Sequence, residues 1–153
     1  MNNLFNTPFE ISMRVLLTLL TSGRESMTLD MVAVSDFLTI YSRDFDISDY
    51  NLHGDNSFSF SEFTSKRKIT KEAIKLLVKN NLIDVLRCDE GFKYLLNDRG
   101  RQVCNNFTSD YAAEYIALAH DVRDFINGKK EIELMNTINK EATSTQERGF
   151  IHG

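Results

Sequence analysis

The sequence predicts a mainly helical domain of the α+β class that contains one small β-hairpin. Apolar residues recur at helical spacing over most of the 153 residues, Pro occurs once and Gly occurs seven times. One segment, residues 82–96, departs from this pattern with an alternating, β-branched run, a turn that contains Gly and a second short run that leads back. The composition, 42% hydrophobic and 26% charged, is that of a globular domain able to bury one core.

The first predicted helix begins at Pro8. Thr7 precedes it as an N-cap, Pro8 suits the first helical position, and Glu10 is placed to complete a capping box. Apolar residues then recur at helical spacing as far as about Thr21, and Gly23 ends the pattern. We expect this helix to place one face in the core.

A second helix is expected from about Thr28 to Tyr41, and Asp36 lies on its apolar side. A carboxylate in that position needs a partner, because burying an unpaired charge is costly. Arg43 or a backbone amide of the following loop would supply one. Two interpretations remain open: a structural ion pair that fixes the loop, or a buried carboxylate with a chemical role.

Residues 43–64 lack helical periodicity and are rich in Asp, Ser, Asn and Phe. A loop of this length is unusual in a compact domain, and such loops are often functional or held by their own aromatic side chains. Four aromatic residues are available for that role: Phe45, Phe58, Phe60 and Phe63. The alternation of Phe and Ser over residues 57–61 also fits a short strand that pairs with the hairpin.

A strongly basic helix is expected to begin at Ser65 and to precede the hairpin. Its cations are Lys66, Arg67, Lys68, Lys71, Lys75 and Lys79. The same segment, residues 66–79, contains one anion, Glu72, so its local charge is +5 in a chain whose net charge is −4. The apolar positions expected to face the core are Ile69, Ala73, Leu76 and Leu77.

The hairpin follows this helix at once. Residues 82–87 and 92–96 form its arms, and residues 89–91 form a turn in which Gly91 takes a positive φ. Asn97 then caps a further helix. A helix, a hairpin and a new helix in this order are typical of a winged helix-turn-helix, in which the helix before the hairpin usually contacts nucleic acid. The same fold also serves as a dimer or partner module.

Contact with DNA is the main functional hypothesis for the basic helix. Lysine attracts phosphate without distinguishing bases, and Arg67 is the one Arg expected on the exposed face of that helix. DNA binding should therefore be weakly specific and sensitive to salt. Arg87 and Lys93, one on each arm of the hairpin, favour such contact. The alternative is that the lysines solvate the outer face of an amphipathic helix.

The C-terminal part is expected to contain a longer helix capped by Ser109 and Asp110. Its apolar stripe consists of Tyr111, Tyr115, Leu118, Val122 and Phe125. The stripe either belongs to the core of the chain or docks a second copy or another protein. We expect residues 1–127 to form the domain, and residues 128–153 to form a short amphipathic segment followed by a polar, poorly ordered tail.

The sequence offers little support for an active site, so we predict a non-catalytic protein without a metal or cofactor. His53, His120 and His152 lie far apart and fit no zinc-binding pattern. Cys88 and Cys104 fit neither a metal site nor a disulfide framework. The chain shows no phosphate-binding Gly-rich loop, no run of ~18 apolar residues and no secretory signal, so a cytoplasmic location is expected.

Short motifs spread over residues 4–125 form a pattern of their own. They are Asn6-Thr7-Pro8-Phe9-Glu10-Ile11 with Arg14, Leu29-Asp30 with Asp36, Ser42-Arg43-Asp44-Phe45, Leu52-His53-Gly54, Glu62 with Arg67, Asn81-Leu82-Ile83-Asp84 and Gly91-Phe92-Lys93-Tyr94. In this order and spacing they resemble the small middle component of bacterial three-component ABC systems, relatives of the Lamassu-type defence operons. The chain departs from the family at Asn81, where relatives often have Gly; Asn also tolerates the left-handed conformation.

The resemblance implies a non-catalytic winged-helix adaptor encoded between an SMC-like ATPase and an effector, often a nuclease, in systems that act against phage or plasmids. It also allows DNA and a second copy of the chain as partners. We expect Asp36, Arg43, Asp44 and His53 to order the long loop for contact with a partner, so that losing Arg43 lowers stability or assembly. The alternative is a stand-alone dimeric winged-helix transcriptional regulator that reads an operator through the basic helix.

Overall fold

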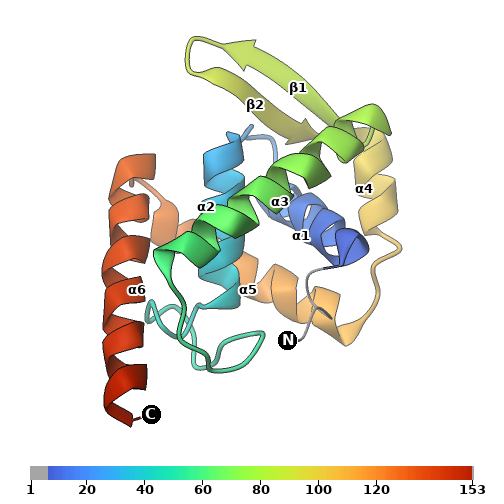
Figure 1. The fold of residues 1–153 in the computed structure, drawn as a ribbon. Coiled ribbons are helices and arrows are strands. Elements are labelled where there is room, and N and C mark those ends of the chain that lie inside the picture. The colour runs from blue at the N-terminus through green and yellow to red at the C-terminus, as the bar shows by residue number, and fades with distance from the viewer. Residues whose placement is uncertain (1–6, 153) are drawn as a thin grey trace.

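The computed structural model describes residues 7–152, which form a mainly helical fold with one two-stranded antiparallel hairpin (Figure 1). In chain order the elements are α1 (Pro8–Thr21), α2 (Leu29–Ile40), α3 (Phe60–Lys79), β1 (Ile83–Cys88), β2 (Gly91–Leu96), α4 (Asp98–Cys104), α5 (Asp110–Ile126) and α6 (Glu131–His152). The predicted α+β class is therefore confirmed. Among these residues, no helix combines the length and the hydrophobicity that a membrane span requires.

Side-chain caps set the starts of five helices. Each capping oxygen accepts a hydrogen bond from a backbone N–H three residues later, which satisfies one of the free donors of the first turn. The caps are Thr7 for α1, Thr28 for α2, Ser59 for α3, Asn97 for α4 and Ser109 for α5. The caps predicted at Thr7, Asn97 and Ser109 are confirmed.

The hairpin has the predicted position and turn. Its register runs from Ile83 opposite Leu96 to Cys88 opposite Gly91, and Gly91 has a φ of +108°. Asn81, in the turn that leads into β1, has a φ of +60°, so it adopts the left-handed conformation that Asn tolerates. The strength of these local signals explains why this part of the fold was predictable.

The partner of the hairpin edge differs from the expectation. Met27, in the turn before α2, exchanges two backbone hydrogen bonds of 2.9 and 2.8 Å with Tyr94 of β2. The alternative of a strand over residues 57–61 is wrong, because this segment is irregular up to Ser59 and α3 begins at Phe60. The hairpin is therefore attached to the N-terminal end of α2.

Two hydrophobic clusters form the interior. The first joins α1 to the inner faces of α3 and α5, to α4 and to the base of the hairpin. The second is aromatic and joins α2 to the long loop, α5 and α6. In it, Phe37 contacts Phe58 edge-to-face with 4.9 Å between ring centroids, and Phe45 and Phe63 are also buried. These aromatic side chains hold the long loop, as the sequence predicted.

The buried face of α3 is not the one that the apolar pattern suggested. Ala73 and Leu77 are buried as expected, but Ile69 and Leu76 are 44% and 48% exposed. At 100° per residue, Ile69 and Leu76 lie two turns apart on the same side of the helix, about 100° around its axis from the centre of the buried face. α3 also begins five residues before the predicted start at Ser65. The spacing of apolar residues alone could not show which side meets α1 and α2.

The C-terminal part differs most from the expectation. Instead of a short segment and a polar tail, α6 is one helix of 22 residues. Leu134, Ile138 and Ala142 are buried against the aromatic cluster, at the spacing of one helical turn. Thr145 also hydrogen-bonds both the N–H and the carbonyl of Phe58, at 3.3 and 3.2 Å, which joins α6 to the long loop.

Candidate functional site

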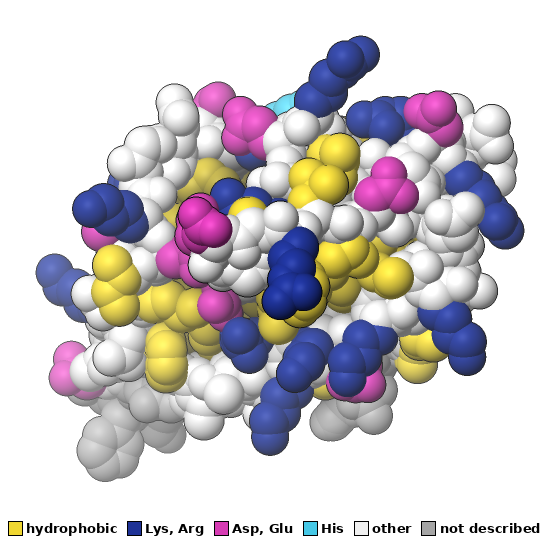
Figure 2. Space-filling model, turned by 90° about the horizontal axis from the view of Figure 1, so that it is seen from above, with side chains coloured by type: hydrophobic (Ala, Val, Ile, Leu, Met, Phe, Trp, Pro, Cys, Tyr) yellow, Lys and Arg dark blue, Asp and Glu magenta, His cyan; other side chains and the backbone are white. Residues whose placement is uncertain are grey.

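Four lysines form a basic face on the outer side of α3: Lys68, Lys71, Lys75 and Lys79, all exposed. Helical geometry places them within an arc of about 80° around the axis. An exposed ion pair of 3.4 Å joins Lys75 to Glu72, and such pairs contribute little to stability. Figure 2 shows the molecule from above, with Lys and Arg side chains around exposed hydrophobic side chains and Asp and Glu side chains among them. We call these four lysines the basic face.

The other two cations of the predicted basic helix are used inside the chain. Lys66 lies 5.7 and 5.4 Å from the ring centroids of Phe37 and Tyr41, and its burial lowers the pKa of its ammonium group. Arg67 forms an ion pair with Asp30 of α2. Both residues therefore attach α3 to α2. Arg67, the one arginine expected to recognise bases, is paired with Asp30 instead.

The two basic residues of the hairpin lie on opposite faces of it. Arg87 is opposite Phe92 in the register, whereas Lys93 is opposite Leu86, and successive side chains of a strand point to opposite sides. Arg87 is exposed. Lys93 forms an ion pair of 3.9 Å with Glu90. The two residues therefore cannot face the same DNA surface together.

The partner of Asp36 is Arg14 of α1, and not Arg43 or a backbone amide of the loop, the two partners expected. Arg14 Nε lies 2.9 Å from Asp36 Oδ1 and Nη2 lies 3.3 Å from Oδ2, and the arginine side chain is 3% exposed. The hydroxyl of Tyr115 donates a hydrogen bond of 2.6 Å to the same carboxylate and shares another of 2.9 Å with Thr18. Asp36 is thus held by two helices, α1 and α5, that pack against α2.

The charge state of this pair supports a structural role. Burial by itself would raise the pKa of Asp36, but the Arg14 guanidinium and the Tyr115 hydroxyl hold it below the usual value. Burial raises the pKa of Tyr115, so that its hydroxyl stays protonated and can donate. The carboxylate is therefore charged and its oxygens are hydrogen-bonded. Of the two interpretations, these contacts favour the structural ion pair over a chemical role.

His53 attaches the long loop to α5. Its Nε2 lies 2.6 Å from the hydroxyl of Tyr111, and the two rings are stacked with 5.8 Å between centroids. Burial, together with the positive charges of Arg14 and Lys66, lowers the pKa of His53 to about 3. The imidazole is therefore neutral at pH 7, and its nitrogen can accept the hydrogen of the tyrosine hydroxyl.

Arg43 and Asp44 lie at the start of the same loop but away from Asp36. The Arg43 guanidinium pairs with Asp55 at 2.5 Å, and both side chains are more than half exposed. Its backbone N–H donates to Asn51 Oδ1 at 2.9 Å. Asp44 is half-buried and its N–H donates to the carbonyl of Tyr41. The predicted set of Asp36, Arg43, Asp44 and His53 is therefore divided between an interior network and the surface.

The apolar stripe of α5 faces the interior. Tyr115, Leu118 and Val122 are at most 4% exposed, and Phe125 packs against the aromatic cluster while half-buried. A partner cannot reach the first three in this conformation. The structure thus favours the interpretation of the stripe as core of the chain itself.

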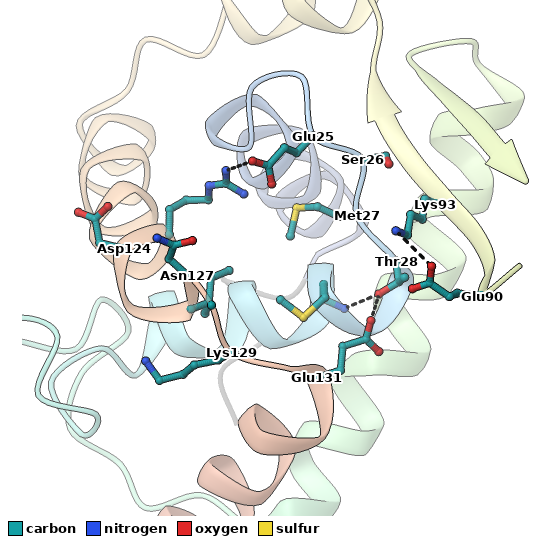
Figure 3. Close-up of a pocket in the computed structure, with 14 residues that line it drawn as sticks. Glu25, Ser26, Met27, Thr28, Glu90, Lys93, Asp124, Asn127, Lys129 and Glu131 are labelled. Atoms are coloured by element: carbon teal, nitrogen blue, oxygen red, sulfur yellow. Dashed lines mark hydrogen bonds and ion pairs between the residues drawn. The ribbon is translucent and has the colours of Figure 1, made fainter. Parts of the chain in front are cut away.

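A pocket of about 450 Å³ opens under the tip of the hairpin (Figure 3). Its charged side chains come from the turn before α2, from the hairpin and from the ends of α5 and α6, and most of them are paired. Arg123 lies 3.5 Å from Glu25, and the hydroxyl of Thr28 donates to Glu131 at 2.8 Å. Among the described residues, no group of three or more His, Cys, Asp or Glu side chains is arranged to hold a metal ion.

Arg14 and Tyr115 are the residues of the interior network that sequence reasoning did not connect to Asp36. Arg14 interrupts the apolar pattern of the first helix, as Asp36 does in the second, and two opposite charges on two apolar faces are a signal that they pair. That signal was present in the sequence.

Comparison with known proteins gives one match. No curated protein and no solved structure matches the chain. Residues 4–148 match the family described as ABC-three component (ABC-3C) system Middle Component 2. The match covers nearly the whole chain, so this protein belongs to the ABC-3C Middle Component 2 family, which indicates a role in an ABC-three-component defence system and implies partner proteins within it.

Proposed function

We propose that this chain is a non-catalytic, cytoplasmic winged-helix adaptor subunit that joins an SMC-like ATPase to an effector in a Lamassu-like system directed against phage or plasmids. We further propose that its basic face contacts the DNA backbone without reading sequence. The observation on which this proposal rests is the basic face itself, four exposed lysines on the helix that precedes the hairpin. Family membership supports the partnership with other proteins.

The arrangement of elements supports the winged-helix assignment. α1, α2 and α3 pack on one another, and the hairpin follows α3 directly. The bridge between Met27 and Tyr94 adds a short extended segment, located between α1 and α2, to the edge of the hairpin. The helix before the hairpin then presents its outer side to solvent, which is where winged helices usually contact DNA.

The residues on the outer side of α3 predict the kind of DNA binding. Lysine neutralises phosphate but does not distinguish bases, and Arg67 is engaged by Asp30. Four phosphate contacts would give a slope of about −3.6 in a plot of log K against log salt concentration. We therefore expect weak binding that is equal on unrelated duplexes.

The test uses fluorescence anisotropy with a labelled random-sequence duplex of ~20 base pairs. Replacing Lys68, Lys71, Lys75 and Lys79 together by Gln should abolish binding, because the phosphate contacts are lost. A matched variant with four other exposed cations replaced, Arg24, Arg99, Lys130 and Lys140, should bind within about twofold of the wild type, since its net charge is the same. Equal loss in both variants would refute a specific role of the basic face.

The stand-alone regulator remains the alternative, and selection from random DNA separates the two. A defined palindromic site would favour the regulator, and sequence-blind binding favours the adaptor. Tyr115, Leu118 and Val122 are buried within the chain itself, so the apolar stripe of α5 does not offer the regulator a surface for dimerisation. Copurification from the native operon tests the adaptor directly: recovery of a coiled-coil ATPase supports it, and a monomer indifferent to such an ATPase rejects it.

A further inference from the structure

A second, larger hollow of about 780 Å³ adjoins the pocket of Figure 3 and shares Thr28, Met31, Glu90, Lys129 and Glu131 with it. Four elements form it: strand β2, the N-terminal turn of α2, the middle of α3 and the start of α6. These elements are far apart in sequence and are brought together only by the fold. We call this hollow the hairpin groove.

Two large apolar side chains line the hairpin groove and are left uncovered. Phe92 of β2 is 54% exposed and Ile132 of α6 is 64% exposed. Leu29 and Tyr94, which are half-buried, add further apolar surface between them. Exposed aromatic and aliphatic side chains that converge on one concavity are typical of a protein-binding surface, because an apolar side chain of a partner can be buried there.

The charges around the groove are unbalanced in favour of cations. Three lysines and three carboxylates line it, but two of the carboxylates form ion pairs with residues outside the lining, Asp30 with Arg67 and Glu90 with Lys93. Glu131 keeps its charge and accepts a hydrogen bond from the hydroxyl of Thr28. Two of its cations, Lys71 of α3 and Lys130 before α6, are exposed and form no ion pair with any described side chain. A ligand in this groove therefore meets free positive charge beside apolar surface.

We propose that the hairpin groove binds a segment of a partner protein that combines acidic residues with large apolar side chains. Its apolar side chains would cover Phe92 and Ile132, and its carboxylates would pair with Lys130 and Lys71. Lys71 belongs to both surfaces, the basic face and the hairpin groove, so it would contact DNA only where the partner segment is absent. DNA fits this surface less well, because its phosphates would gain nothing from the apolar floor. This inference rests on the proposed adaptor role, since it names the surface through which a partner is held.

Site-specific cross-linking tests the proposal in the assembled complex. The chain is coexpressed with the other two components of its operon, with a photoreactive phenylalanine analogue in place of Phe92 or, as a control, of Leu86. Leu86 lies on the same hairpin and is 45% exposed, but it points to the opposite face. We expect position 92 to cross-link to a segment of one partner that contains acidic and apolar residues, and position 86 to cross-link at least fivefold less.

The outcomes separate this proposal from the adaptor role. If the three proteins form no complex, the adaptor role and the groove proposal both fail. If the complex forms but position 92 cross-links no more than position 86, or cross-links to DNA or to a second copy of this chain, only the groove proposal fails.

Affinity measurements give an independent second test. The double variant Phe92→Ser/Ile132→Ser should bind the partner at least tenfold more weakly, and Lys71→Glu/Lys130→Glu should do the same at low salt. The control Leu76→Ser/Leu86→Ser removes two other exposed apolar side chains, which lie outside the groove, and should leave affinity within twofold. Equal weakening by both apolar pairs would overturn the assignment of this surface. All the replaced side chains are exposed, so folding should be retained.

Discussion

Lowering the pH from 7 to 5 should destabilise this fold through one side chain, His53. In the folded protein, burial lowers the pKa of His53 to about 3, whereas in the unfolded chain it should be near 6.5. Between these two values the unfolded chain binds a proton that the folded protein does not bind, so stability falls as the pH falls. The loss begins near pH 6.5 and ends near pH 3.

The size of the effect follows from the width of this window. Each pH unit inside it costs about 1.4 kcal/mol, so the 1.5 units between pH 6.5 and pH 5 cost about 2 kcal/mol. Few carboxyl groups titrate above pH 5, so His53 should dominate this range. A loss of this size is a large part of the stability of a domain, which is typically about 5–15 kcal/mol.

Urea unfolding followed by circular dichroism at pH 7, 6 and 5 measures the effect. His53→Gln keeps a side chain that can accept the hydrogen bond of Tyr111 but cannot take up a proton, so its stability should change by about 2 kcal/mol less over this range. His120→Gln is the matched control, because it makes the same substitution at an exposed histidine. Identical pH dependence of the wild type and His53→Gln would refute the reasoning.

Three further substitutions test the interior and the long loop, each by urea unfolding at pH 7. Asp36→Ala should cost about 3–5 kcal/mol, because it leaves the buried charge of Arg14 without its partner; a loss below about 1 kcal/mol would show that the pair is not structural. Arg43→Ala should cost about 1 kcal/mol or less, because its ion pair is exposed, and a larger loss would restore the stronger role predicted from sequence. Gly100→Ala should cost about 1–3 kcal/mol or more, because the new Cβ would lie 2.2 Å from the carbonyl oxygen of Leu82; wild-type stability would contradict this.

The features that sequence predicted well depend on residues close together in the chain. A capping side chain acts on an N–H three residues later, and the hairpin turn needs only Gly91 and its two strands. These signals are local, so they act regardless of what the helix or hairpin later packs against. The helix starts at Thr7 and Asn97 and the hairpin register were therefore accessible without a structure.

The partner of Asp36 was harder to predict, because the signal for it lies on two separate helices. Arg43 is nearer in sequence, but Arg14, 22 positions before Asp36, is brought to it by the packing of α1 on α2. Sequence distance favoured the wrong arginine, because it does not show which neighbouring helix packs against the side of α2 that carries Asp36. The hairpin groove was not predicted for the same reason, since Phe92 and Ile132 line one groove only because α6 packs on α2.

Counting the charges of the basic segment in the sequence overestimates the number of cations on its exposed surface. The sequence placed six cations on one helix, but Lys66 lies against aromatic rings and Arg67 pairs with Asp30, so four remain on the basic face. Six phosphate contacts would give a salt slope of about −5.4, whereas four give about −3.6. A measured slope near the steeper value would mean that Lys66 and Arg67 leave their partners when DNA binds, which would require α3 to loosen from α2. We expect the shallower slope, because both residues then keep the contacts that attach α3 to the rest of the fold.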